Sequence, residues 1–115
     1  MNDLTNESEP AFHLFLDADE LPVAASALRL LIADEAHQPD IRRLAREVLA
    51  DIDAAPPDHD ALSLPLSAPQ MKITYSALRL LINDLQREQA DERQILWRIV
   101  EKLPDEHAIR AIVLE

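Results

Sequence analysis

The chain has 115 residues, a formal net charge of −11, no glycine and no cysteine. The lack of glycine excludes glycine-rich phosphate-binding loops and the G-x-S-x-G nucleophile elbow, and the lack of cysteine excludes disulfides, thiolate nucleophiles and zinc fingers. The strong negative charge disfavours nucleic acid and anionic membranes as partners.

The N-terminal segment, residues 1–10, is polar and acidic, and we expect it to be a disordered tail. It lacks the basic start and apolar centre of a signal peptide, and no apolar run approaches the ~20 residues of a membrane span. We therefore expect a cytoplasmic protein whose residues 11–115 form a single domain.

The sequence repeats itself. A shift of fifty residues aligns 13–32 with 63–82 without a gap, and ten of the twenty positions are identical, seven of them in the run SALRLLI. This likeness predicts an internal duplication, with repeats at 11–55 and 61–103.

Each repeat opens with alternating apolar residues, at 12–16 and at 62–66, and this period of two predicts a short strand. Pro65 has no N–H group to donate to a neighbouring strand. The second strand should therefore lie at the edge of its sheet or be short.

Capping boxes follow both strands and predict that a helix begins there: Asp17 with Glu20, and Ser67 with Gln70. Pro22 is expected to delay or kink the first of these helices, because proline is disfavoured beyond the first helical turn.

A second helix is predicted in the first repeat, from about residue 39 to residue 52. In the second repeat, no proline interrupts residues 71–103, which leaves two possibilities. They could form one long helix over 70–103, or a helical hairpin with a turn near 87–90. We favour the hairpin because it matches the first repeat.

The C-terminal segment 108–114 is rich in β-branched residues and predicts a third strand. The resulting order is β-α-α-β-α-α-β. The predicted fold is helix-dominated α+β, with a small antiparallel three-stranded sheet packed by four helices.

Histidine and carboxylate residues lie together before the second and third predicted strands, and they are weak candidates for a metal site. These residues are Asp58, His59, Asp60, Asp105 and His107. Such side chains bind divalent cations, but adjacent residues rarely point at one ion, and a solvated turn is the favoured explanation of their composition. We therefore predict no metal and no cofactor.

Other candidates for a ligand site or an interface come from the repeated stripe and from the aromatic residues. Arg29 and Asp34 recur as Arg79 and Asp84, and Tyr75 lies on the same helical stripe as Arg79. An arginine in an apolar run can pair with a carboxylate on a neighbouring helix, across a subunit boundary or on a ligand. Trp97 is the only tryptophan, and tryptophan is enriched at interfaces.

Three functional hypotheses follow. The first is a non-enzymatic protein that acts through protein association, most simply as a homodimer. The second is a module that binds a small molecule or a cation between the two repeats. The third is an acidic mimic of nucleic acid that blocks a DNA-binding protein. No catalytic motif is found, so no enzyme is predicted.

Overall fold

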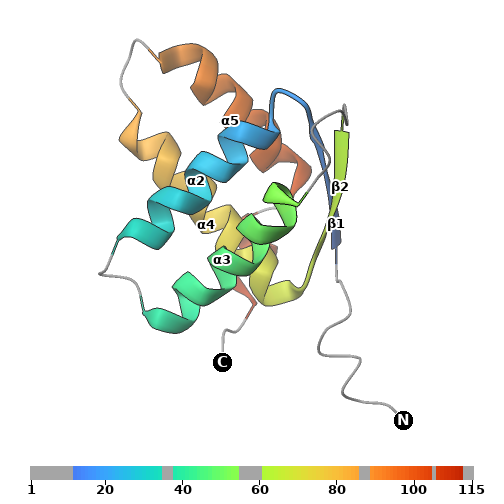
Figure 1. Ribbon diagram of the computed structural model, residues 1–115, viewed down its shortest axis with the longest axis vertical. Coiled ribbons are helices and arrows are strands. Elements are labelled where there is room, and N and C mark those ends of the chain that lie inside the picture. The colour runs from blue at the N-terminus through green and yellow to red at the C-terminus, as the bar shows by residue number, and fades with distance from the viewer. Residues whose placement is uncertain (1–11, 35–37, 55–60, 86–88, 105, 113–115) are drawn as a thin grey trace.

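The computed structural model describes residues 12–34, 38–54, 61–85, 89–104 and 106–112. Within these residues the fold is helix-dominated α+β, as predicted. It has two strands and five helices, where a three-stranded sheet and four helices were expected (Figure 1). The elements are β1 (Phe12–Asp17), α2 (Leu21–Ala33), α3 (Pro39–Asp53), β2 (Ala61–Leu66), α4 (Ala68–Asp84), α5 (Ala90–Lys102) and α6 (Glu106–Arg110).

The two strands pair antiparallel in the register Leu14↔Leu64 and Leu16↔Leu62. All helices lie on one side of this sheet (Figure 1). Because side chains alternate along a strand, every second residue points toward the helices, and Leu14, Leu16, Leu64 and Leu66 are buried in the core. Pro65 lies on an edge strand, as predicted from its missing N–H group.

The prediction of a third strand over 108–114 is wrong. Residues 106–110 form helix α6, and the sheet has two strands in the described part of the chain. Ile109 is buried against the core and Ile112 is partly buried. Ile109 lies on α6 and Ile112 just beyond it, and this segment packs beside α4, which outweighs the strand propensity of its β-branched residues.

The helical hairpin predicted in the second repeat is confirmed, because α4 ends at Asp84 and α5 begins at Ala90. The order β2-α4-α5 thus matches β1-α2-α3. A shift of 51 residues superimposes the buried positions of the second helices: Ala45, Val48 and Ile52 correspond to Leu96, Ile99 and Leu103. The extra residue lies in α4, which ends one residue later than α2 does relative to the repeated sequence, and the two turns are equal in length.

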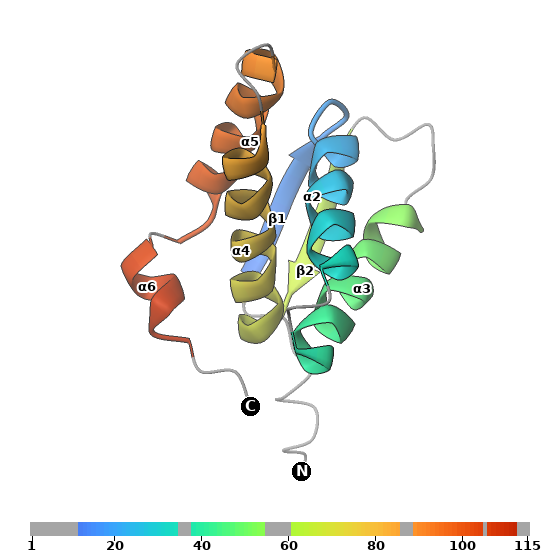
Figure 2. The same ribbon diagram turned by 90° about the vertical axis from the view of Figure 1, so that its left-hand side faces the viewer.

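A pseudo-twofold axis relates the repeats. Leu14 and Leu64 are equivalent residues and face each other in the register, so the axis passes between them, perpendicular to the sheet. α2 and α4 lie side by side and run in opposite directions (Figure 2). Both helices bury a small residue at the same position, Ala27 and Ala77, which lets two backbones approach closely.

The capping box at Ser67 is complete, because its hydroxyl accepts from the Gln70 N–H and the Gln70 side chain accepts from the Ser67 N–H. The first repeat differs. α2 begins only at Leu21, with Pro22 in its first turn, and its N-cap residue Glu20 makes no capping hydrogen bond through its side chain. A start at Asp17 would put Pro22 beyond the first turn, where its missing N–H would break the helix.

No described residue has a positive φ angle. Helices commonly end on a glycine in the left-handed region, which this chain lacks. Instead α2, α4 and α5 each end on a residue with extended backbone, at Asp34, Leu85 and Leu103. Among the described helices, none is long and apolar enough to cross a bilayer.

Candidate functional site

No described element covers the face of the sheet that points away from the helices. Its six residues are all exposed: His13, Phe15 and Asp17 from β1, and Ala61, Ser63 and Pro65 from β2. Phe15 lies in the middle of β1 with 62% of its surface exposed, the most of the large apolar residues described. We call these six residues the outer face.

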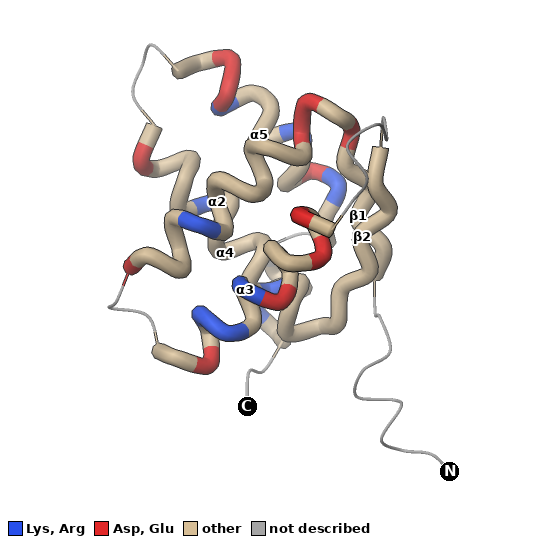
Figure 3. The backbone as a smooth tube through the Cα atoms, in the orientation of Figure 1, with Lys and Arg blue, Asp and Glu red and all other residues tan. Residues whose placement is uncertain are grey.

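The outer face carries little charge. Asp17 is the only acidic or basic residue in β1, apart from the titratable His13, and β2 has none. Figure 3 shows the same contrast, with the charged residues distributed over the helices and the turn that follows β1. For a chain with a net charge of −11, this is an unusually neutral surface.

Part of the free edge of β1 is occupied. Pro65 has no N–H, so its pair with His13 cannot be a hydrogen-bonded one. Because hydrogen-bonded and non-hydrogen-bonded pairs alternate along the ladder, Phe15 and Asp17 direct their backbone groups away from β2. The Phe15 carbonyl accepts from Lys102 Nζ at 2.8 Å, and the Asp17 N–H donates to Glu20 Oε1 at 2.7 Å. These bonds occupy two of the outward backbone groups that another strand would need at this edge.

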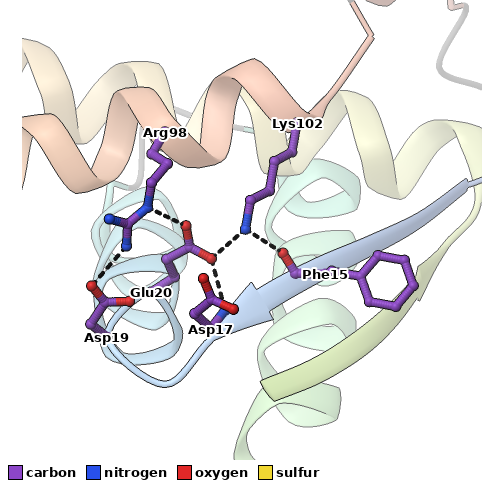
Figure 4. Close-up of polar contacts among 6 residues, drawn as sticks. All are labelled: Phe15, Asp17, Asp19, Glu20, Arg98 and Lys102. Carbon is purple, nitrogen blue, oxygen red and sulfur yellow. Dashed lines mark hydrogen bonds and ion pairs between the residues drawn. The ribbon is translucent and has the colours of Figure 1, made fainter. Parts of the chain in front are cut away.

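Glu20 is the centre of this arrangement (Figure 4). Its side chain is fully buried, yet it binds two cations of α5: Arg98 Nε donates to Oε2 at 2.7 Å, and Lys102 Nζ donates to Oε1 at 2.6 Å. Arg98 also pairs with Asp19 at 2.7 Å. We call Asp19, Glu20, Arg98 and Lys102 the Glu20 network.

The hydrogen bonds keep Glu20 ionised despite its burial. Burial raises the pKa of Glu20, but hydrogen bonds from Lys102, from the Asp17 N–H and from Arg98 outweigh this and hold the pKa below its ordinary value. The hydrogen bonds with Asp19 and Glu20 raise the pKa of Arg98. The network therefore holds charged groups in place, and its Glu20 is poorly suited to proton transfer at neutral pH.

An equivalent contact exists on the other side of the pseudo-twofold axis. Gln70 corresponds to Glu20, and Glu47 of α3 corresponds to Arg98 of α5. Gln70 Nε2 donates to Glu47 Oε1 at 3.2 Å. In both places the start of one repeat's first helix contacts the second helix of the other repeat, so these polar contacts join the two repeats.

Three of the predicted site residues meet on α4 and α5. The Arg79 guanidinium lies 5.1 Å from the centroid of the Trp97 ring and 5.9 Å from that of Tyr75, and Arg79 Nη1 donates to the Tyr75 hydroxyl at 3.1 Å. Trp97 is 40% exposed. This aromatic–arginine cluster belongs to the second repeat alone.

The remaining predicted residues do not join that cluster. Arg29 pairs with Asp53 of α3 at 3.4 Å, and both side chains are exposed. Asp34 is exposed at the C-cap of α2, and Asp84 is exposed in the last turn of α4. Arg29 and Arg79 thus contact different residues.

The weak metal candidates are not brought together within the described residues. Asp58, His59, Asp60 and Asp105 lie outside them, and His107 is exposed on α6. No group of three or more potential ligands that could hold a metal is found in the described part.

Phe15, Arg98 and Lys102 were not predicted as site residues from the sequence. One signal for Phe15 is present: it occupies an outward position of an alternating strand, where a polar residue is expected. Arg98 and Lys102 are four residues apart and hence on one face of α5, but nothing in the sequence links them to Glu20, which lies 78 residues before Arg98.

Searches with the whole chain find no matching protein-family model, no matching curated protein and no matching solved structure.

Proposed function

We propose that this chain is a non-enzymatic protein-association module and that it functions as a homodimer. The observation that carries the proposal is the exposure of Phe15, 62%, at the middle of a sheet face that carries little charge and that no described element covers. Aromatic residues are enriched at protein interfaces, and charged residues are depleted at their centres.

The alternative of ligand binding draws support from the contact of Tyr75, Arg79 and Trp97. A guanidinium beside aromatic rings is a group that recognises carboxylates and phosphates in proteins. A thermal-shift screen with carboxylates, phosphates and divalent cations tests it, since a ligand at 100 times its Kd stabilises by about 2.7 kcal/mol.

Acidic mimicry of nucleic acid is less well supported. α3 carries Arg42, Arg43 and Arg46 among its acidic residues, so this helix does not present a continuous negative ridge.

Light scattering on a sizing column, at several protein concentrations, tests the association. We expect the mean mass to rise from that of one chain toward that of two as concentration increases. A single-chain mass at every concentration, together with failure to recover a protein partner in a pull-down with the intact chain, would contradict the proposed function.

A further inference from the structure

We infer that the outer face docks on the outer face of a second copy of this chain, with the twofold axis over the Phe15–Ser63 pair. This inference rests on the proposed function and specifies the surface and the partner. This surface is distinct from the free edge of β1, where Lys102 and Glu20 bond the Phe15 carbonyl and the Asp17 N–H.

The register of the sheet makes this face complementary to itself. Phe15 pairs with Ser63, and Asp17 pairs with Ala61. Consider two copies whose outer faces meet, with a twofold axis that lies in the plane between the two sheets and runs perpendicular to the strands. This axis stacks each strand on its own copy, in the opposite direction. Phe15 then meets Phe15 of the second copy, and Ala61 meets Pro65. Aromatic pairs and apolar contacts of this kind stabilise stacked sheets.

Polar pairing selects this arrangement. His13 and Asp17 lie two residues on either side of Phe15, so each His13 faces Asp17 of the second copy, where the imidazole N–H can donate to the carboxylate, and the interface contains two such pairs. A twofold axis parallel to the strands would instead place Phe15 against Ser63 and Asp17 against Ala61, leaving each carboxylate against an apolar side chain. Complementary polar groups on facing positions fix the relative orientation of two proteins.

The size of the face sets the expected affinity. Two strands of six residues form a small surface, well below the ~800 Å² per partner of a standard stable interface. We therefore expect a weak dimer whose population depends on concentration, and whose formation relies on the central Phe15.

The decisive experiment compares Phe15→Ser with Trp97→Ser, the substitutions of the two large exposed apolar residues. Masses are measured by light scattering over the same concentration range as for the unchanged chain. We expect Phe15→Ser to raise the dimer dissociation constant about tenfold or more, and Trp97→Ser to leave it within a factor of about two. Circular dichroism checks that both variants are folded.

A second pair of variants tests the orientation. His13→Asp places carboxylates against Asp17 of the second copy and should weaken the dimer. Adding Asp17→His restores an imidazole opposite a carboxylate at both facing positions, and we expect the double variant to recover most of the lost affinity. Because the side chains of His13 and Asp17 are both exposed in the single chain, we expect both variants to fold as the unchanged chain does.

The outcomes separate the inference from the proposed function. A dimer that survives Phe15→Ser and is lost in Trp97→Ser would overturn the inference, while association itself would stand. A dimer weakened by His13→Asp and not recovered by the double variant would overturn the orientation. A chain that is always monomeric overturns the inference. If that monomer also binds no protein partner, the proposed function fails with it.

Discussion

At the scale of single residues, Glu20 shows how a local pattern acquires a different role in the fold. Its spacing from Asp17 correctly indicates that the two residues interact, and Glu20 does accept the Asp17 N–H. Because Pro22 delays the helix, however, the carboxylate becomes buried between two cations of α5. The sequence allows the first interaction to be predicted, because it is local, but not the second.

Glu20→Gln should destabilise the protein. The variant keeps the shape of the side chain but removes the charge that Arg98 and Lys102 share, and hydrogen bonds to charged groups contribute about 1.5–3 kcal/mol. We expect a loss of about 2 kcal/mol in the free energy of unfolding, measured with urea. Asp19→Asn is the control: its carboxylate binds the same Arg98 but is largely exposed, and it should cost less than about 1 kcal/mol.

The stability should also depend on pH through Glu20. Its pKa is lowered in the native protein, because the hydrogen bonds outweigh the effect of burial, whereas in the unfolded chain it titrates near pH ~4.3. The stabilisation is therefore complete above that pH and is lost as pH falls through the lower native pKa. In urea titrations from neutral to acidic pH, the unchanged chain should lose stability more steeply than Glu20→Gln. If the free energy of unfolding depended equally on pH in the unchanged chain and in Glu20→Gln, the pH dependence could not be assigned to Glu20.

At the scale of elements, starts of helices were easier to predict than the nature of the last segment. The Ser67 box, the strands and the helical hairpin follow from neighbouring residues and are found as expected. The segment around Ile109 was misassigned because its β-branched residues favour a strand, while the space beside α4 selects a helix. Only the position of α4 distinguishes the two outcomes.

Ser67→Ala should weaken the start of α4, because the Gln70 N–H loses its acceptor. Loss of such a cap costs about 1 kcal/mol. Thermal unfolding followed by circular dichroism measures the effect. Ser76→Ala in the same helix is the matched control: Ser76 is exposed within the helix, where alanine is the better helix former, so its melting temperature should not fall.

At the scale of the whole molecule, the pseudo-twofold axis determines which residues meet. The repeat was visible in the sequence, but the way in which the repeats pack was not. The second helices, α3 and α5, align only after a shift of 51 residues. At the position that contacts the other repeat, α3 has the acidic Glu47 and α5 has the basic Arg98. Glu20 with Arg98 and Gln70 with Glu47 are therefore equivalent contacts that have a different residue type at each equivalent position.

This equivalence can be tested by building the first contact in the place of the second. Gln70→Glu alone sets two carboxylates together beside Glu47, and Glu47→Arg alone loses the contact with the Gln70 amide. The double variant recreates a Glu–Arg pair. A double-mutant cycle in urea should give a favourable coupling on the order of 1 kcal/mol. Additive effects would show that the two contacts are not geometrically equivalent.

The absence of positive φ angles from the described residues has a consequence for the unfolded chain as well. Glycine loses more backbone conformational entropy on folding than any other residue, and proline begins with its φ angle already restricted. With no glycine and eight prolines, this chain has fewer conformations to give up than an average sequence of its length. Extended helix ends at Asp34, Leu85 and Leu103 make that composition possible. Part of the stability of this small fold thus comes from a restricted denatured ensemble and corresponds to no contact in the native structure.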